Sequence, residues 1–292
     1  MASASFGVMF FTDQLDGRQL EALAVRLESS GLDTLWLPEL FGREVFSTAG
    51  FLLARTETLR VASGIANVYA RDPMGAVQAA HGLNELSEGR FILGLGVSNP
   101  GIAGARGHAW VPPVAKLGDY FDAMDAVAVK APAASKPAPI YLAAHGRRML
   151  GLARDRCNGA NTYLMSPAHT AAARRVLGPD RALNVVQHCL LCPGESPEAA
   201  RALARRAVGR YVELDYYRRV WRTLGFGDTD FTEGGSDRLI DTLVAWGDIE
   251  AIRERLAEHR ASGADEIIVV PLNAAGGGRE PDWGLIDGLA RL

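Results

Sequence analysis

The stretch from Thr58 to Pro73 reads TLRVASGIANVYARDP, and it decides the fold class. Its first half is an apolar run typical of a buried strand, which leads into Ser63 and Gly64. Its second half is polar and ends at Pro73, a residue type that favours the first turn of a helix. A buried strand that ends in polar residues before a helix is typical of a parallel α/β protein. Such proteins bind their ligands at the carboxyl ends of the strands.

The same alternation of strand and helix continues along most of the chain. Eight apolar runs predict strands, at 6–11, 33–37, 59–66, 91–97, 140–143, 159–163, 184–191 and 266–270. Amphipathic segments predict helices, at 19–30, 45–55, 73–86, 114–130, 147–156, 167–177, 197–224, 237–246 and 249–262.

No long linker separates these elements, so the pattern predicts one α/β domain over residues 1–292. The expected architecture is a (β/α)8 TIM barrel with a helical insertion near the C-terminus, the variable regions being about 98–115 and 209–247. A doubly wound sheet with a helical appendage is the alternative.

Composition narrows the function classes. The chain has 292 residues, 48% of them hydrophobic and 22% charged, and a net charge of -3, which is ordinary for a globular enzyme. This balance predicts no nucleic-acid partner and no membrane-surface patch. The N-terminal residues lack the pattern of a signal peptide and no apolar run is long enough to span a membrane, so we expect a cytoplasmic protein.

The three cysteines are Cys157, Cys189 and Cys192, and they form no even disulfide set. His188 beside Cys189 permits a metal interpretation, but a zinc site needs four ligands, or three with water. We therefore predict no metal site and interpret these residues as the structural end of a strand.

Polar residues follow several of the predicted strands. Glu39 comes where the second strand stops, so its carboxylate either faces a pocket or interacts with backbone N–H groups at a helix start. Asn67 and Tyr69 follow the third strand, and Ser98 and Asn99 follow the fourth. Amides and hydroxyls without strong bases indicate hydrogen bonding to a heteroaromatic ring rather than hydrolysis.

Familiar phosphate and nucleophile motifs are missing from the sequence. It has no Gly-x-Ser-x-Gly elbow and no Gly-x4-Gly-Lys-Ser/Thr loop. The run Gly94–Ser98 is only a fragment of a dinucleotide fingerprint, and we interpret its glycines as thinning the sheet so that a flat ligand can approach the backbone.

The fifth strand runs into His145, Gly146, Arg147 and Arg148 at a helix start. This arrangement suits an anion, because backbone N–H groups point outward and the helix dipole favours negative charge. A surface helix with solvated arginines is the alternative, and His145 is expected to contribute its backbone N–H. The aromatic residues Tyr216, Tyr217, Trp221 and Phe226 indicate core or a subunit interface, or else a roof over a pocket.

Taken together, four motifs resemble those of the luciferase-like monooxygenase superfamily, and within it the deazaflavin branch that uses coenzyme F420. They read GLDTLWLPE at 31–39, SGIANVYARDP at 63–73, GRFILGLGVS at 89–98, and the closing segment from Gly247-Asp248 to Gly263-Ala264-Asp265. The resemblance covers nearly the whole chain and implies a luciferase-like TIM barrel.

The resemblance also implies a cofactor site and a non-proline cis peptide bond in a bulge after the third strand, at Gly64–Ile65. The bulge would support the ring of coenzyme F420, or of FMN as the alternative cofactor. The implied cofactor-binding residues are Gly64, Ile65, Ala66, Asn67, Val97, Ser98 and Asn99 around the ring, and Ala144, His145, Gly146, Arg148 and Met149 at the phosphate-binding turn.

Two departures bear on the reaction that the resemblance implies. Members that oxidise alcohols or sugar phosphates carry an acidic residue followed by His after the second strand, but here Leu40 follows Glu39. Ser166 stands where sugar-phosphate members have a Lys. The expected reaction is therefore hydride transfer to a C=C or C=N bond of a small-molecule substrate, with Glu39 as candidate proton donor assisted by Tyr69.

Other functions stay open. One is an FMN-dependent monooxygenase of the same fold, and another is a non-catalytic ligand-binding barrel. A homodimer is expected from the resemblance and from the apolar helix at 73–86. The sequence identifies no substrate.

Overall fold

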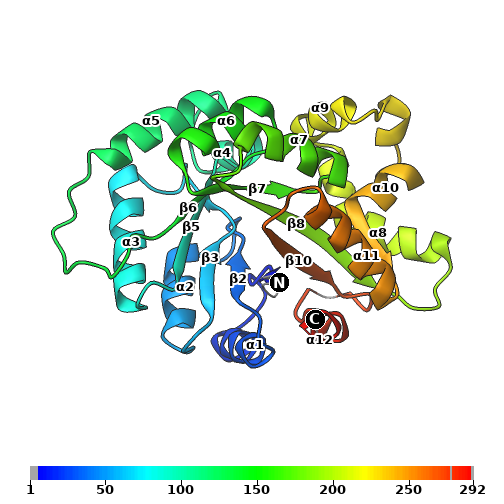
Figure 1. Cartoon of the computed structure of the whole chain (residues 1–292), viewed down its shortest axis with the longest axis horizontal. Helices are drawn as coiled ribbons and strands as arrows, with labels where there is room; N and C mark the ends of the chain where they lie inside the picture. Colours follow the sequence, from blue (N-terminus) through cyan, green and yellow to red (C-terminus); the bar gives the residue numbers. More distant parts are fainter. Residues whose placement is uncertain (1–5, 277, 291–292) are drawn as a thin grey trace. The chain divides into compact units, whose positions relative to one another are not determined.

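The computed structural model of this protein describes residues 6–276 and 278–290 (Figure 1). These residues form two compact units. The N-terminal unit runs from Met9 to Asn161, and the C-terminal unit joins the described part of Met1–Val8 to that of Thr162–Leu292. Each unit consists of parallel strands alternating with helices, as the sequence predicts.

The N-terminal unit has a parallel sheet in the order β2-β3-β5-β6-β7, and β4 also pairs with β5. The bounds are β2 (Thr34–Leu37), β3 (Arg60–Ser63), β4 (Ala66–Asn67), β5 (Phe91–Gly96), β6 (Ile140–Ala143) and β7 (Gly159–Tyr163). The helices are α1 (Gly17–Ser29), α2 (Val45–Leu53), α3 (Pro73–Leu86), α4 (Pro100–Ala105), α5 (Pro113–Asp125) and α6 (Arg147–Arg156).

Local sequence explains where these helices begin and which face they bury. Asp16 and Gln19 form a capping box at the start of α1, and the Asp72 side chain accepts from the Gly75 N–H with Pro73 in the first turn of α3. The buried face of α1 is the predicted set, Leu20, Leu23, Ala24 and Leu27. Helices α2 and α3 lie side by side and pack on β3 and β5 (Figure 1).

The C-terminal unit has its parallel strands in the order β1-β10-β8-β9. They are β1 (Phe6–Met9), β8 (Ala182–Leu191), β9 (Val244–Gly247) and β10 (Glu266–Leu272). The helices are α7 (Pro167–Leu177), α8 (Pro197–Val212), α9 (Asp215–Thr223), α10 (Asp237–Leu243), α11 (Ile249–Ala261) and α12 (Trp283–Ala290), with a 3-10 turn at Asp228–Phe231.

The aromatic stretch of the C-terminal unit is core. Trp221 is completely buried and donates its ring N–H to the Leu164 carbonyl at 3.0 Å. Tyr217 stacks on it, with the ring centroids 5.3 Å apart. Phe226 is buried as well. The core interpretation of these three residues is therefore confirmed.

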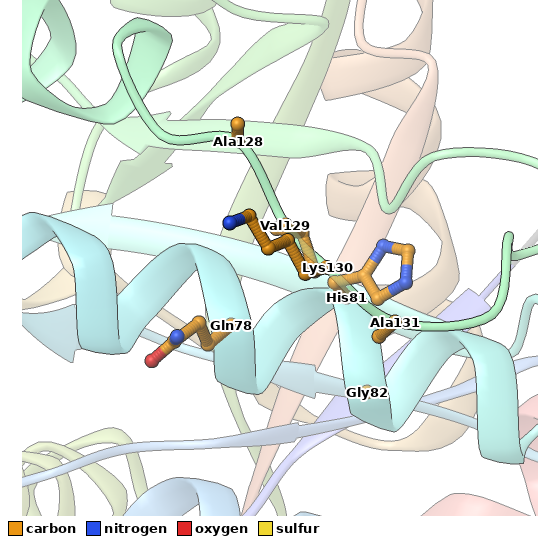
Figure 2. A pocket seen from close by; sticks show the side chains of 7 residues that line it. All are labelled: Gln78, His81, Gly82, Ala128, Val129, Lys130 and Ala131. Carbon is orange, nitrogen blue, oxygen red and sulfur yellow. The ribbon is translucent and has the colours of Figure 1, made fainter.

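A shallow pocket of about 340 Å³ lies along the outside of α3 (Figure 2). Gln78, His81 and Gly82 of the helix line one side, and the connector at 128–131 lines the other. The His81 ring nitrogen Nε2 lies 2.8 Å from the Pro132 carbonyl and ties the connector to the helix. None of the predicted site residues lines this pocket. The same helix leaves Met74 and Leu86 exposed, and the homodimer stays a prediction.

Two sequence expectations concern membrane-spanning helices and metal sites. Within 6–276 and 278–290, no helix is both long and apolar enough to cross a membrane. The same residues hold no group of three or more His, Cys, Asp or Glu side chains placed to bind a metal ion.

Candidate active site

The site begins at a bulge between β3 and β4. In β3, Ala62 pairs with Ile92 of β5, and in β4, Ala66 pairs with Leu95. The chain advances four residues from 62 to 66 while β5 advances three from 92 to 95, so one extra residue is accommodated. The Gly64–Ile65 peptide bond within this bulge is cis, as the resemblance implies.

The Ser63 side chain provides hydrogen bonds to β5 where the bulge interrupts the backbone pairing. Its hydroxyl donates to the Gly94 carbonyl at 2.8 Å and accepts from the Gly94 N–H at 2.9 Å. Ser63 is fully buried, so both polar groups of Gly94 are paired away from water. The serine of the sequence motif therefore holds the bulge against β5.

The glycines of β5 fit the bulge rather than a ligand, which corrects our sequence interpretation. A Cβ on Gly94 would lie 2.0 Å from the Ser63 carbonyl oxygen. A Cβ on Gly96 would lie 2.8 Å from Cγ1 of Ile65. Both positions lack a side chain because the protein's own backbone and the Ile65 side chain occupy the space.

Asn67, at the end of β4, has a fixed orientation. Its side-chain oxygen accepts from the Tyr69 N–H at 2.9 Å, and its backbone N–H donates to Glu39 Oε2 at 2.8 Å. The side-chain Nδ2 is buried and has no hydrogen-bond partner in the described chain. Because burying an unpaired donor costs roughly 1–3 kcal/mol, this amide is suited to a bound acceptor.

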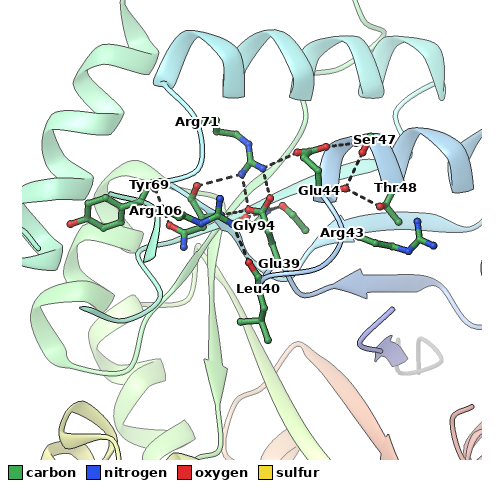
Figure 3. Close-up of polar contacts among 12 residues, drawn as sticks. Glu39, Leu40, Arg43, Glu44, Ser47, Thr48, Tyr69, Arg71, Gly94 and Arg106 are labelled. Atoms are coloured by element: carbon green, nitrogen blue, oxygen red, sulfur yellow. Dashed lines mark hydrogen bonds and ion pairs between the residues drawn. The ribbon is translucent and has the colours of Figure 1, made fainter. Parts of the chain in front are cut away.

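Glu39 forms a buried ion pair with Arg71 (Figure 3). Arg71 Nη1 donates to Glu39 Oε2 at 2.9 Å, and Nη2 donates to Glu39 Oε1. The side chains are only 3% and 12% exposed. Arg71 Nη2 also contacts Glu44 Oε1 at 2.8 Å, and its guanidinium lies 4.5 Å from the centroid of the Phe46 ring.

The charges of this cluster support one another. Burial by itself would lower the pKa of Arg71, but the hydrogen bonds and charges of Glu39 and Glu44 outweigh burial and raise that pKa above its ordinary value. Arg71 is therefore a permanent cation. Arg71 lies within the motif at 63–73, but the sequence predicts no role for it. Its contact with Glu39 joins residues 32 apart in the chain, and such a contact leaves no local sequence signal.

The geometry bears on the candidate proton donor. Both carboxylate oxygens of Glu39 accept hydrogen bonds from charged or backbone donors, so protonation would sacrifice a charge-assisted bond. The carboxylate that interacts with backbone N–H groups at a helix start is that of Glu44 and not of Glu39. The Glu44 side chain caps α2 by accepting from the Ser47 N–H. The ion pair favours a positioning role for Glu39, and its role as donor stays a prediction.

Tyr69 contacts the segment between α4 and α5 through its hydroxyl and its ring. Its hydroxyl accepts from the Val111 N–H at 3.0 Å, and its ring stacks on Trp110 with centroids 5.9 Å apart. Lys116 Nζ lies 4.9 Å from the centroid of the same ring. Tyr69 therefore anchors this segment, and its predicted assistance in proton transfer stays untested.

Val97, Ser98 and Asn99 follow β5 and turn the chain into α4. Val97 is buried, and Ser98 adopts a left-handed backbone conformation with φ of 57°. The Asn99 side chain accepts from the Ile102 N–H at 3.1 Å and so caps α4. Its side-chain oxygen is thus occupied, a structural role that the sequence prediction did not include.

The predicted phosphate-binding turn lies between β6 and α6. Ala144 is buried and donates its N–H to the Asn161 carbonyl at 3.0 Å, whereas Gly146 and Arg148 are exposed and His145 and Met149 are half-buried. Gly146 precedes α6 without a side-chain cap. The first N–H groups of α6 therefore lack the side-chain acceptor that Asp72 and Asn99 give to α3 and α4.

His188 and Ser166 have local structural roles. His188 Nε2 lies 3.2 Å from the Tyr163 hydroxyl, and the Tyr163 hydroxyl lies 2.9 Å from that of Tyr211. Ser166 caps α7 by accepting from the His169 N–H at 3.2 Å. The cysteines are buried and form no disulfides.

The chain belongs to the luciferase-like monooxygenase family, whose model matches residues 4–266. It is similar to a protein of Mycobacterium tuberculosis whose name assigns it provisionally to the coenzyme F420-dependent oxidoreductases, with 25% identity over 85% of this chain and 89% of that protein. It is also similar to the 5,10-methylenetetrahydromethanopterin reductase of Archaeoglobus fulgidus, with 24% identity over 90% of this chain and 92% of the reductase.

Solved structures confirm the fold. The coenzyme F420-dependent tetrahydromethanopterin reductase of Methanopyrus kandleri superposes with a TM-score of 0.73 and 17% identity, over 99% of this chain and 98% of that one. The oxygenating component of the FMN-bound 3,6-diketocamphane monooxygenase from Pseudomonas putida gives a TM-score of 0.70 and 15% identity, over 99% and 97%. The expected luciferase-like TIM barrel is therefore correct, and the doubly wound alternative is wrong.

Proposed function

We propose that this protein is a coenzyme F420-dependent oxidoreductase that transfers hydride between the reduced deazaflavin and a C=C or C=N bond of a small organic substrate. Two relatives found over most of the chain carry names that refer to coenzyme F420 or to a reductase. The observation that carries the proposal is the buried, unpartnered Nδ2 of Asn67 beside the bulge.

The residues present fit such a cofactor. Asn67 would donate to an acceptor atom of the ring, because its amide is held in one orientation by Tyr69 and its backbone by Glu39. The bulge at Gly64–Ile65, with Ile65 packed over Gly96, would form the surface beneath the ring. The uncapped start of α6 with Arg148 would hold a phosphate.

A bound deazaflavin supplies or accepts the hydride. The chain's own part is to hold the ring edge and to keep the bulge in place. Leu40 removes the imidazole that alcohol-oxidising members of the superfamily carry after the acidic residue. A substrate whose reduction needs no hydroxyl base is therefore favoured, and a C=C or C=N bond satisfies that condition.

Equilibrium binding of the purified chain to coenzyme F420 and to FMN tests the proposal. We expect submicromolar binding of coenzyme F420, and about tenfold weaker binding in Asn67→Ala, the loss of roughly one hydrogen bond. Asn84→Ala is the control, because Asn84 is a buried asparagine of α3 that bonds the Lys136 carbonyl and lies outside the site.

Two outcomes would overturn the proposal. Tight binding of FMN with none of coenzyme F420 would favour the monooxygenase alternative, for which the FMN-bound structural relative is the supporting observation. Binding of neither cofactor would favour the non-catalytic ligand-binding alternative.

A further inference from the structure

The inference concerns Asn161, the central residue of β7. Its side chain is buried, with the residue only 4% exposed. Neither Oδ1 nor Nδ2 has a hydrogen-bond partner among the described residues. A buried amide that leaves both a donor and an acceptor unpaired is rare in folded proteins, since each unpaired group costs free energy.

Sheet register places Asn161 in one row with Asn67. Asn67 pairs with Gly96 of β5, and Ala143 of β6 pairs with Asn161 of β7. The ladder between β5 and β6 ends at Leu95 and Leu142, so Gly96 and Ala143 are the next neighbours. A Cβ on Gly96 would lie 3.3 Å from the Cβ of Ala143, which confirms that the two residues adjoin.

Residues paired in register on parallel strands point to the same face of the sheet. The two asparagines therefore lie on the same face of the sheet, three strand spacings of about 4.8 Å apart, or about 14 Å measured along the sheet. Between them the row contains only the small residues Gly96 and Ala143, and the Ile65 side chain packs against Gly96. The row thus places small residues between two buried asparagines that have unpaired amide groups.

We propose that Asn161 binds the ring edge of the flat cofactor, at the point where a carbonyl and an N–H stand side by side. The carboxamide matches such an edge because Oδ1 accepts from the N–H while Nδ2 donates to the carbonyl. Flavins and deazaflavins share this imide edge. The inference rests on the proposed function for the class of ligand, and it holds for either cofactor.

The alternative occupant of the unpaired amide is a structural water, because buried waters commonly bridge otherwise unsatisfied groups. The two cases differ in what removal of the amide does. If the amide is unpaired until a cofactor binds, an apolar side chain of similar size removes two unpaired polar groups and does not destabilise the cofactor-free protein. If water satisfies the amide, the same substitution removes its hydrogen bonds and destabilises that protein.

The experiment compares Asn161→Leu with the wild type by thermal unfolding without cofactor and by equilibrium binding of coenzyme F420 and FMN. We expect an unchanged or higher midpoint of unfolding and at least tenfold weaker binding of whichever cofactor the wild type binds. The control Asn84→Ala should lower the midpoint and leave binding unchanged, since Asn84 Nδ2 donates to the Lys136 carbonyl outside the site.

A cofactor methylated at the imide nitrogen identifies the atoms involved. Methylation should weaken binding to the wild type by about tenfold and have little further effect in Asn161→Leu, because both changes remove the same contact. Equal losses on methylation in both proteins would overturn the inference. A lowered midpoint with unchanged binding would also overturn it and assign the amide to a water.

These outcomes separate the inference from the proposed function. Binding of FMN alone, weakened in Asn161→Leu, would contradict the choice of coenzyme F420 and support the role of Asn161. Tight binding of coenzyme F420 that is indifferent to Asn161→Leu would do the reverse.

Discussion

Glu39 and Asn67 are buried polar residues in contact with each other, and their side chains differ in how completely they are hydrogen-bonded. Every oxygen of the Glu39 carboxylate is engaged by Arg71 or by the Asn67 N–H, whereas Asn67 Nδ2 has no partner in the described chain. A fully bonded group stabilises the fold, and an unpaired one is available to a ligand. This difference supports our proposal that Glu39 positions the bulge and that Asn67 contacts the cofactor.

Substitution of Glu39 by Gln tests this assignment. The amide can still accept from the Asn67 N–H, but it leaves Arg71 with Glu44 as its remaining acidic partner. Removing one member of a buried pair costs up to roughly 3–5 kcal/mol, and Glu44 should reduce that cost to about 2 kcal/mol. We expect lower stability in urea unfolding and weaker cofactor binding, with the pH profile of kcat unchanged in shape.

The matched control is Glu44→Gln, which alters the other partner of Arg71 at a carboxylate that is 50% exposed and should cost less than 1 kcal/mol. A donor role for Glu39 would give the opposite pattern. Glu39→Gln would then lose turnover and one limb of the pH profile while retaining cofactor affinity.

At the scale of elements, the β3–β4 bulge depends on the two glycines of β5. Gly94→Ala would place a Cβ 2.0 Å from a backbone oxygen that cannot move without disrupting the bulge, so we expect a loss of more than about 3 kcal/mol. Gly96→Ala meets the Ile65 side chain, which can shift, so we expect roughly 1–2 kcal/mol together with weaker cofactor binding.

Guanidinium unfolding of both variants measures these losses, with Gly82→Ala as the control. Gly82 lies on α3 with nothing within 4 Å of an added Cβ, and alanine there should stabilise the helix by up to about 1 kcal/mol. Equal stabilities for Gly94→Ala and Gly82→Ala would contradict the account of the bulge.

The sequence predicted elements best where one local signal dominates. The eight predicted strands all form, because each is an apolar run bounded by turn or helix-start residues. The bulge position followed from the family resemblance. Residues 244–246 were predicted as the end of a helix, but Val244–Gly247 forms β9. The reason is that β8 is ten residues long and offers this segment an unpaired edge from His188 onward.

Other differences have similar causes. The predicted helix at 197–224 is two helices, α8 and α9, separated by Glu213 and Leu214. Helix α4 was missed because its Gly-rich sequence has low helix propensity, and the Asn99 cap with Pro100 was the signal that could have revealed it. The Glu39–Arg71 and Asn67–Asn161 relationships required the sheet register, which periodicity cannot supply.

For the whole molecule, two buried histidines of the C-terminal unit predict how stability depends on pH. Burial, with the Arg210 charge, lowers the pKa of His188 to about 3. Burial, with Arg255 and His169, lowers that of His259 to about 3. His259 lies between the Thr170 hydroxyl at 2.8 Å and Gln187 Oε1 at 3.0 Å, contacts that suit one neutral tautomer.

The direction in which pH changes the stability follows from the linkage between proton binding and folding. The unfolded chain binds protons at these histidines as the pH falls through about 6.5, whereas the folded chain does so only near pH 3. Their contribution to stability is therefore fully present above about pH 6.5 and declines from there toward pH 3. Between pH 7 and pH 5.5, each histidine should account for a loss of about 1 kcal/mol.

Urea unfolding at pH 7 and pH 5.5 measures this loss in the wild type and in His188→Phe. The variant removes one titrating group while Tyr163 keeps its contact with Tyr211, so we expect its loss between the two pH values to be about 1 kcal/mol smaller. His108→Gln serves as the control, because His108 is exposed and lies in the N-terminal unit. If His188→Phe and the wild type lost the same stability on acidification, His188 would have to be charged in the folded protein, and the buried neutral arrangement with Tyr163 would be wrong.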